Sequence, residues 1–241
     1  MLFCGNFFSL FPVAPSGLPC CPGDGKREEK KCLQSVFFCV ILTGKNYQRT
    51  VKNMSKLSLE RAKEILPKHT TEQHLFVHAA CVSAAMGAMA GVFGEDKDHW
   101  EAIGWLHDVD YEKYPSTEEH CHHVRELLEP EGVDEADIRS IISHGYGITT
   151  DEVKPESNLE KSLFTVDELT GIVHAYALMR PEGMDGMSVK SFKKKFKDLK
   201  FAAKCNREVI NRGFEMLGLE PSVVMQACID GMTAHKDEIG F

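Results

Sequence analysis

The segment "GWLHDVDYEKYP" at 104–115 places two side chains that can bind metal ions, His107 and Asp108, next to each other at the end of an apolar run. Burying an imidazole or a carboxylate without a partner costs about 1–3 kcal/mol or more. The pair therefore predicts a common polar partner. A divalent cation fits, because imidazole and carboxylate together suit Fe, Mn, Zn or Co, whereas Mg and Ca prefer oxygen atoms alone.

Other histidine and aspartate residues also fall on or beside apolar helix faces. A single histidine on such a face is more often a hydrogen-bonded core residue, and one at a helix end can reflect the helix dipole. Taken together, the set predicts a site for one or two divalent transition-metal ions (Fe, Mn, Co or Zn), with Asp108 able to bridge two ions. No cysteine falls among these positions, which disfavours a thiolate zinc site. The predicted ligands are His78, His107, Asp108, His120, His144 and Asp167.

The elements that must position these residues are helices. From Met54 onward, apolar residues recur at helical spacing and no alternation typical of strands is present. We therefore predict an all-α domain of about 7–9 helices over 54–241. Helix starts are predicted at Asp134 and at two capping boxes, and further helices are predicted over three C-terminal ranges. The boxes are Ser116–Glu119 and Ser157–Glu160, and the ranges are 188–197, 200–217 and 220–238.

Residues 1–53 differ from the rest of the chain. They combine a Pro/Gly-rich piece, "FPVAPSGLPCCPGDG", with a charged run, "KREEKK", and they hold five of the nine cysteines. No helical period runs through them. We interpret this segment as an upstream extension with Met54 as the true initiator, or alternatively as a disordered tail.

Composition limits the partners. The formal net charge of −8 disfavours nucleic acid, whose binding proteins present a basic face. No apolar run is long enough to predict a transmembrane helix, so no membrane partner is expected. The cysteines after Met54 are scattered through helical patterns, as expected of free thiols in the reducing cytoplasm. Oligomeric state stays open.

The order of His78, then His107-Asp108, then Asp167 resembles the H…HD…D signature of the HD-domain superfamily of metal-dependent phosphohydrolases. The resemblance covers 54–241, and "GWLHDVDYEKYP" is similar to the HD segment of a bacterial branch of HD-domain hydrolases. It implies an HD-domain-like helical bundle. His120 and His144 fall where two-metal members carry ligands for their second metal, as in the branch that cleaves diadenosine tetraphosphate. "HGYG" at 144–147 departs from the GYP motif of cyclic-dinucleotide phosphodiesterases.

The resemblance implies a metal-dependent phosphohydrolase that acts on a nucleotide or another small phosphoester or phosphoanhydride through a metal-activated water. Asp108 would be central to catalysis as the bridging ligand. Independently of the resemblance, Lys161 lies six residues before Asp167 on the same predicted helix and is the candidate to hold the phosphate at the rim of the site, the alternative being an ordinary solvated lysine. Gly145 stands where the diadenosine branch commonly carries a further histidine, which leaves the substrate open. Two alternatives also remain: a di-iron HD-fold oxygenase and a non-catalytic HD module that senses a ligand.

Overall fold

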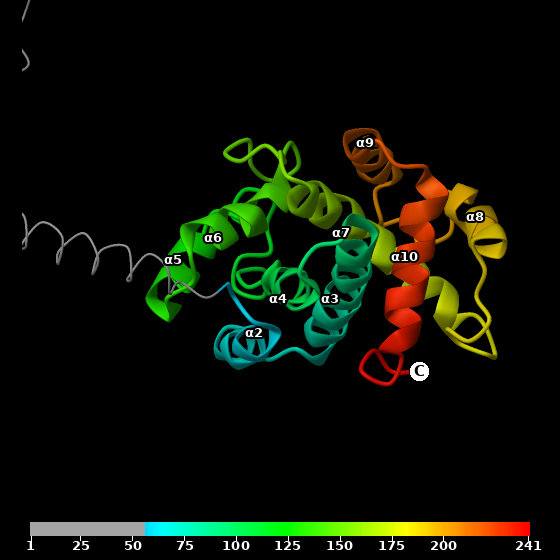
Figure 1. Cartoon of the computed structure of the whole chain (residues 1–241), viewed down its shortest axis with the longest axis horizontal. Helices are drawn as coiled ribbons and strands as arrows, with labels where there is room; N and C mark the ends of the chain where they lie inside the picture. Colours follow the sequence, from blue (N-terminus) through cyan, green and yellow to red (C-terminus); the bar gives the residue numbers. More distant parts are fainter. Residues whose placement is uncertain (1–55) are drawn as a thin grey trace, which may run out of the picture. The chain divides into compact units, whose positions relative to one another are not determined.

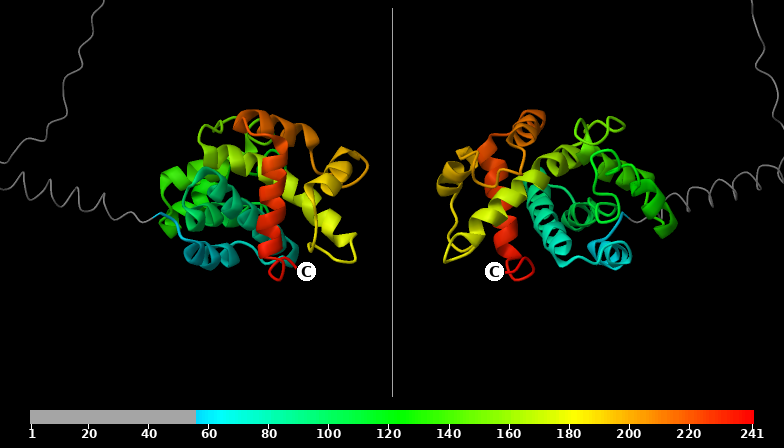
Figure 2. Two further views of the ribbon diagram at one scale, coloured as in Figure 1. Left: turned by 45° about the vertical axis from the view of Figure 1, so that its right-hand side comes forward. Right: turned by 180° about the vertical axis from the view of Figure 1, so that it is seen from behind.

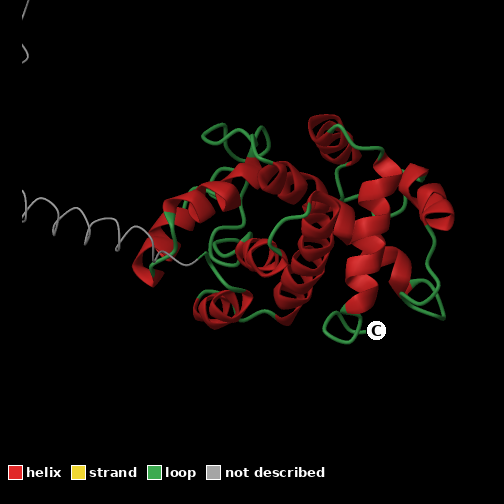
Figure 3. Ribbon diagram, viewed as in Figure 1, coloured by secondary structure: helices red, strands yellow, loops and turns green. Residues whose placement is uncertain are grey.

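The computed structural model describes residues 56–241, and the predicted N-terminal extension 1–53 lies outside the described residues. Within 56–241 the chain forms nine α-helices and no strand (Figures 1 and 3). One isolated bridge between Tyr146 and Thr150 is the only β-type pairing in that range. The prediction of an all-α bundle of 7–9 helices is therefore confirmed for the described part of the chain.

The helices follow one another with three short 3₁₀ segments between them. The 3₁₀ segments are η1 (Leu66–Lys68), η2 (Glu129–Glu131) and η3 (Ser143–Gly145). The α-helices are α2 (Leu59–Ile65), α3 (Gln73–Phe93), α4 (Lys97–Leu106), α5 (Val124–Leu128), α6 (Glu135–Ile142), α7 (Asn158–Leu178), α8 (Val189–Lys197), α9 (Arg207–Leu217) and α10 (Pro221–Ala234).

Two long helices, α3 and α7, form the centre of the bundle. Helix α3 packs against α4 and α10 and also contacts α7, while α9 packs against α7 (Figures 1 and 2). Small residues allow this close packing. A Cβ added to Gly104 of α4 would lie 2.9 Å from the Cα of Ser83 in α3, and one added to Gly231 of α10 would lie 2.2 Å from the carbonyl oxygen of Ala84. The apolar interior on both sides of α3 holds this helix in place.

Helix α3 is long and apolar enough, by length and composition, to cross a membrane. However, 61% of the residues in that apolar window are buried inside the bundle, and the helix contacts α4, α7 and α10. A core helix of a bundle passes the same length and composition test. The expectation of no membrane partner stays a prediction.

Two helix starts in the second half of the chain follow the sequence signals, whereas the helix predicted over 200–217 begins only at Arg207. The predicted capping box at Ser157 and Glu160 is present in full at the start of α7, and Asp134 caps α6 by accepting from the backbone N–H of Ala136. The capping box predicted at Ser116–Glu119 is wrong. The hydroxyl of Ser116 donates to the carboxylate of Glu119, and no helix begins between the end of α4 at Leu106 and the start of α5 at Val124.

The segment between α4 and α5 is instead a series of turns over 107–123. Cys121 has a φ of 70°, a left-handed conformation that cannot continue a right-handed helix. The buried carboxylate of Asp110 accepts hydrogen bonds from Nδ1 of His120 and from the backbone N–H of His123. Contacts with the site interior therefore decide the shape of this segment, and its capping signal does not.

Candidate metal centre

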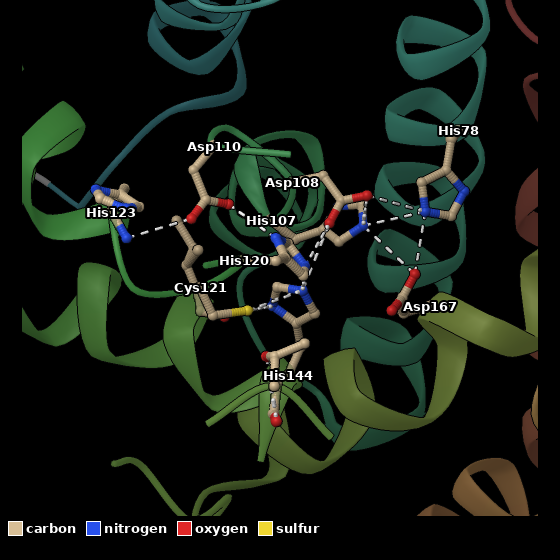
Figure 4. A network of polar contacts seen from close by, with 12 residues as sticks. His78, His107, Asp108, Asp110, His120, Cys121, His123, His144 and Asp167 are labelled. Atoms are coloured by element: carbon tan, nitrogen blue, oxygen red, sulfur yellow. Dashed lines mark hydrogen bonds and ion pairs between the residues drawn. The ribbon is translucent and has the colours of Figure 1, made fainter. Parts of the chain in front are cut away.

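The structure brings all six predicted metal ligands together in one cluster (Figure 4). They come from five separate segments of the chain. His78 lies in the second turn of α3, His107 and Asp108 follow α4 directly, His120 lies in the turns before α5, His144 lies in η3, and Asp167 lies midway along α7. The side chains form two neighbouring groups, with Asp108 between them.

The first group lies between α3, α4 and α7. The Nε2 atom of His78 is 3.0 Å from Oδ1 of Asp167 and 3.2 Å from Nε2 of His107. Oδ2 of Asp108 is 3.2 Å from Nε2 of His107 and 3.5 Å from Nε2 of His78. His107 is fully buried. Two imidazole nitrogens and two carboxylate oxygens therefore converge on one small volume.

The second group lies on the other side of Asp108. The Nε2 atoms of His120 and His144 are 3.1 Å apart. Oδ1 of Asp108, the oxygen that faces away from the first group, is 3.4 Å from Nε2 of His120 and 3.5 Å from Nε2 of His144. The two oxygens of one carboxylate thus face different pairs of histidines, which is the arrangement of a ligand shared between two cations.

Hydrogen bonds on the far side of three imidazoles fix which ring nitrogen carries the proton. Each Nδ1 faces an oxygen acceptor, so Nδ1–H donates and the Nε2 lone pair points into the cluster. The pairs are His107 with the carbonyl oxygen of Gly104 at 2.8 Å, His144 with that of Ile141 at 2.6 Å, and His120 with Oδ1 of Asp110 at 2.9 Å. Facing lone pairs repel unless a proton or a metal ion lies between them, so these donors suit a cation.

The electrostatics of the cluster also favour positive charge. Burial, the largest effect on His107, favours the neutral ring, but Asp108 and Asp167 together raise its pKa to about 9. Burial is likewise the largest effect on His120 and opposes its charge, but the hydrogen bonds to Asp110 and Cys121 and the charge of Asp108 together raise the pKa of His120 to about 10. Burial disfavours the ionised form of Asp108 as well, yet His107 holds the pKa of this carboxyl well below its usual range. Divalent ions can supply the same charge in exchange for these protons.

Two residues of the cluster were missed by the sequence interpretation. Asp110 is fully buried and accepts from His120, but its position two residues after Asp108 carries no distinct helical signal. Cys121 places its Sγ 3.6 Å from Nε2 of His144. Successive residues on a helix point about 100° apart, which would have turned Cys121 away from a site that contains His120. The left-handed backbone at Cys121 turns the thiol inward instead.

The Cys121 thiol is nearly fully buried. Burial alone would raise its pKa, but the neighbouring imidazoles, His144 foremost, lower the pKa to about 6. His120, Cys121 and His144 form one group of donors that could hold a metal ion, and His78, His107 and Asp167 form another. The predicted ligand set contains no cysteine, whereas the structure places Cys121 among the residues that could hold a metal ion.

The cluster opens into a cavity of about 500 Å³. Five of the predicted ligands line it, namely His78, Asp108, His120, His144 and Asp167. Its walls add Tyr111, Ser116, Thr117, Ile148, Thr149 and Glu168. Lys161 is not among the residues that line the cavity, so the structure gives no support to its predicted role in holding phosphate. No Lys or Arg of the described chain lines this cavity.

Comparisons of the chain with protein-family models, curated proteins and solved structures gave no match. The resemblance to HD-domain proteins therefore stays a prediction that rests on His78, His107, Asp108 and Asp167. The geometry of the donor set provides a separate argument for metal binding, because it does not depend on any relative.

Proposed function

We propose that the protein is a metal-dependent phosphohydrolase with a two-ion centre. The observation that carries this proposal is the position of Asp108. Its two oxygens face two separate groups of histidine nitrogens whose lone pairs converge. Carboxylate-bridged pairs of divalent ions are a common arrangement in enzymes that hydrolyse phosphoesters.

His78, His107 and Asp167 would hold one ion, His120 and His144 would hold the other, and Asp108 would contact both. Bound ions of this kind polarise phosphoryl oxygens and lower the pKa of water towards 7. Imidazole and carboxylate ligands favour Fe, Mn, Co or Zn. The cavity beside Asp108 is partly open to solvent, so a substrate can reach the centre through it.

The chemistry of the cavity wall narrows the substrate. Ser116, Thr117 and Thr149 make part of the wall polar, while Tyr111 and Ile148 supply apolar surface. Because no lysine or arginine of the described chain lines the cavity, its wall carries no permanent positive charge to offset the negative charge of a polyphosphate chain. We therefore favour a phosphomonoester with a small organic group, such as a nucleoside monophosphate, over a nucleoside polyphosphate.

The test compares the full-length protein with Asp108→Ala. Metal content per chain is measured after anaerobic purification, and hydrolysis is measured with a panel of monophosphates, phosphodiesters and polyphosphates. We expect two transition-metal ions per parent chain, loss of most metal and of hydrolysis in Asp108→Ala, and fastest turnover of monophosphates. Asp151→Ala is the matched control, because Asp151 is an exposed carboxylate outside the cluster.

The alternatives predict different results. A di-iron oxygenase would consume oxygen with an organic substrate and leave the phosphate panel untouched. A ligand-sensing module would bind a panel member without turning it over. Failure to bind metal after reconstitution with Mn, Fe, Co and Zn in turn would overturn the proposed mechanism.

A further inference from the structure

Cys121 offers a donor atom that the two-ion centre described above leaves without a role. Its Sγ lies 3.6 Å from Nε2 of His144, a nitrogen that faces the interior of the cluster. One ring nitrogen each of His120 and His144 and the sulfur of Cys121 all lie within 4.8 Å of one another. Cys121 is 1% exposed and does not line the cavity, so the sulfur reaches the cluster from the protein side. A ligand at this position would leave the substrate side open.

Two further features hold the sulfur at this place. Cys121 has a φ of 70°, a backbone conformation that residues with a Cβ seldom adopt and that tends to persist at functional sites. Gly145 leaves room for the thiol. A Cβ at position 145 would lie 2.7 Å from Sγ of Cys121 and 2.4 Å from Oγ1 of Thr149. The glycine after His144 and the unusual backbone of Cys121 together direct the sulfur towards the two histidines.

We propose that Cys121 is a thiolate ligand of the second ion, together with His120, His144 and the carboxylate of Asp108. This inference rests on the two-ion centre proposed above and adds the identity of the metal. A thiolate with two imidazoles favours Zn²⁺ and other thiophilic divalent ions over Mg²⁺ and Mn²⁺. The bond forms between sulfur and the ion as the S–H proton leaves to solvent, and no electron is transferred.

Charge balance favours the same assignment. Asp108 and Asp167 supply two negative charges against the four positive charges of two divalent ions. A thiolate at Cys121 adds a third negative charge without bringing another carboxylate into the cluster.

X-ray absorption of the zinc-loaded full chain tests the proposal directly. Zn–S contacts of about 2.3 Å are resolved from Zn–N and Zn–O contacts of about 2.0–2.2 Å. We expect one sulfur neighbour for every two zinc ions in the parent protein and no sulfur neighbour in Cys121→Ser. Cys205→Ser is the matched control, because Cys205 lines the cavity beside the cluster but lies outside the donor group. The zinc ions of this variant should keep the sulfur neighbour.

A parent protein that binds two zinc ions without sulfur would overturn the assignment of Cys121, as would a sulfur neighbour that persists in Cys121→Ser. A second measurement, on the parent protein alone, avoids any folding defect of the variant. Co²⁺ loading should produce thiolate-to-cobalt charge-transfer absorption, and the absence of this absorption would also overturn the proposal.

Hydrolysis is assayed separately on the parent. Turnover without a sulfur ligand would reject this inference alone, and a sulfur ligand without turnover would reject the phosphohydrolase alone.

Discussion

The carboxylate of Asp110 lies 2.9 Å from Nδ1 of His120. Since a carboxylate only accepts, Nδ1 of His120 is the protonated nitrogen and Nε2 is the free donor atom. A second hydrogen bond, from the backbone N–H of His123 to Asp110, holds the carboxylate in place. Asp110 thus orients His120 without itself facing the cluster, a relationship typical of metal-binding histidines.

Replacement of Asp110 with Asn should weaken metal binding at the second site. The variant keeps the size of the side chain but can present a neutral amide in place of the charged acceptor that fixes His120. We expect a loss of affinity of about 10–100-fold for one of the two ions, with the other ion little affected. Competition titration with a chromogenic chelator measures both affinities.

Glu118→Gln serves as the control for Asp110→Asn. Glu118 lies in the same series of turns, but its side chain is exposed. Both affinities should stay at the parent value in this variant. Equal affinities in Asp110→Asn and Glu118→Gln would contradict the orienting role of Asp110.

The pKa shifts predict how the stability of metal-free protein depends on pH. The folded-state pKa values of His107 and His120 are about 9 and about 10, above the ordinary value of 6.5. The stability that these two residues contribute is therefore complete below pH 6.5 and is lost as pH rises through 9–10. The pKa values of Asp108 and Asp167 lie below the ordinary value of 3.8, so their contribution is present above pH 3.8 and is lost as pH falls further. Maximum stability from these groups therefore lies between pH 3.8 and 6.5.

Urea denaturation after treatment with a chelator measures this profile. The free energy of unfolding of metal-free protein should fall between pH 7 and pH 10. Protein loaded with metal should not lose stability in this alkaline range, because the ions then occupy the place of the protons. A metal-free profile that is flat from pH 7 to pH 10 would show that the cluster does not bind extra protons.

The sequence predicted most of the site because its ligands lie where regular helices place them. His78 and Asp167 lie on α3 and α7, two long helices that the spacing of apolar residues predicts. Cys121 and Asp110 lie in turns over 107–123, where no periodicity relates sequence position to direction. Hydrogen bonds from His120 and His123 to the buried carboxylate of Asp110 shape the backbone there, and residue spacing does not reveal them. The role of Lys161 stays a prediction, since helical spacing from Asp167 does not reveal the extent of the cavity and Lys161 does not line it.

The two predicted capping boxes lead to losses of stability of different size for the same Ser→Ala substitution. Ser157→Ala should destabilise the protein by about 0.5–2 kcal/mol, because the Ser157 hydroxyl accepts from the backbone N–H of Glu160 at the start of α7. Ser116→Ala should change the free energy of unfolding much less, because the Ser116 hydroxyl contacts only the exposed side chain of Glu119. Urea denaturation of both variants at constant metal load measures the difference. Equal losses in the free energy of unfolding of the two variants would indicate that Ser116 also caps a helix.

Packing of α4 against α3 predicts opposite effects for two Gly→Ala substitutions. In Gly104→Ala the new Cβ would lie 2.9 Å from the Cα of Ser83, and this backbone cannot move without separating the two helices. We expect a loss of about 1–3 kcal/mol and weaker metal binding, because His107 and Asp108 follow directly after α4. Gly91→Ala is the matched control in α3: nothing lies within 4 Å of its added Cβ, so it should stabilise the protein by about 0.5–1 kcal/mol. A Gly104→Ala protein as stable as the parent would mean that α3 and α4 do not pack this closely.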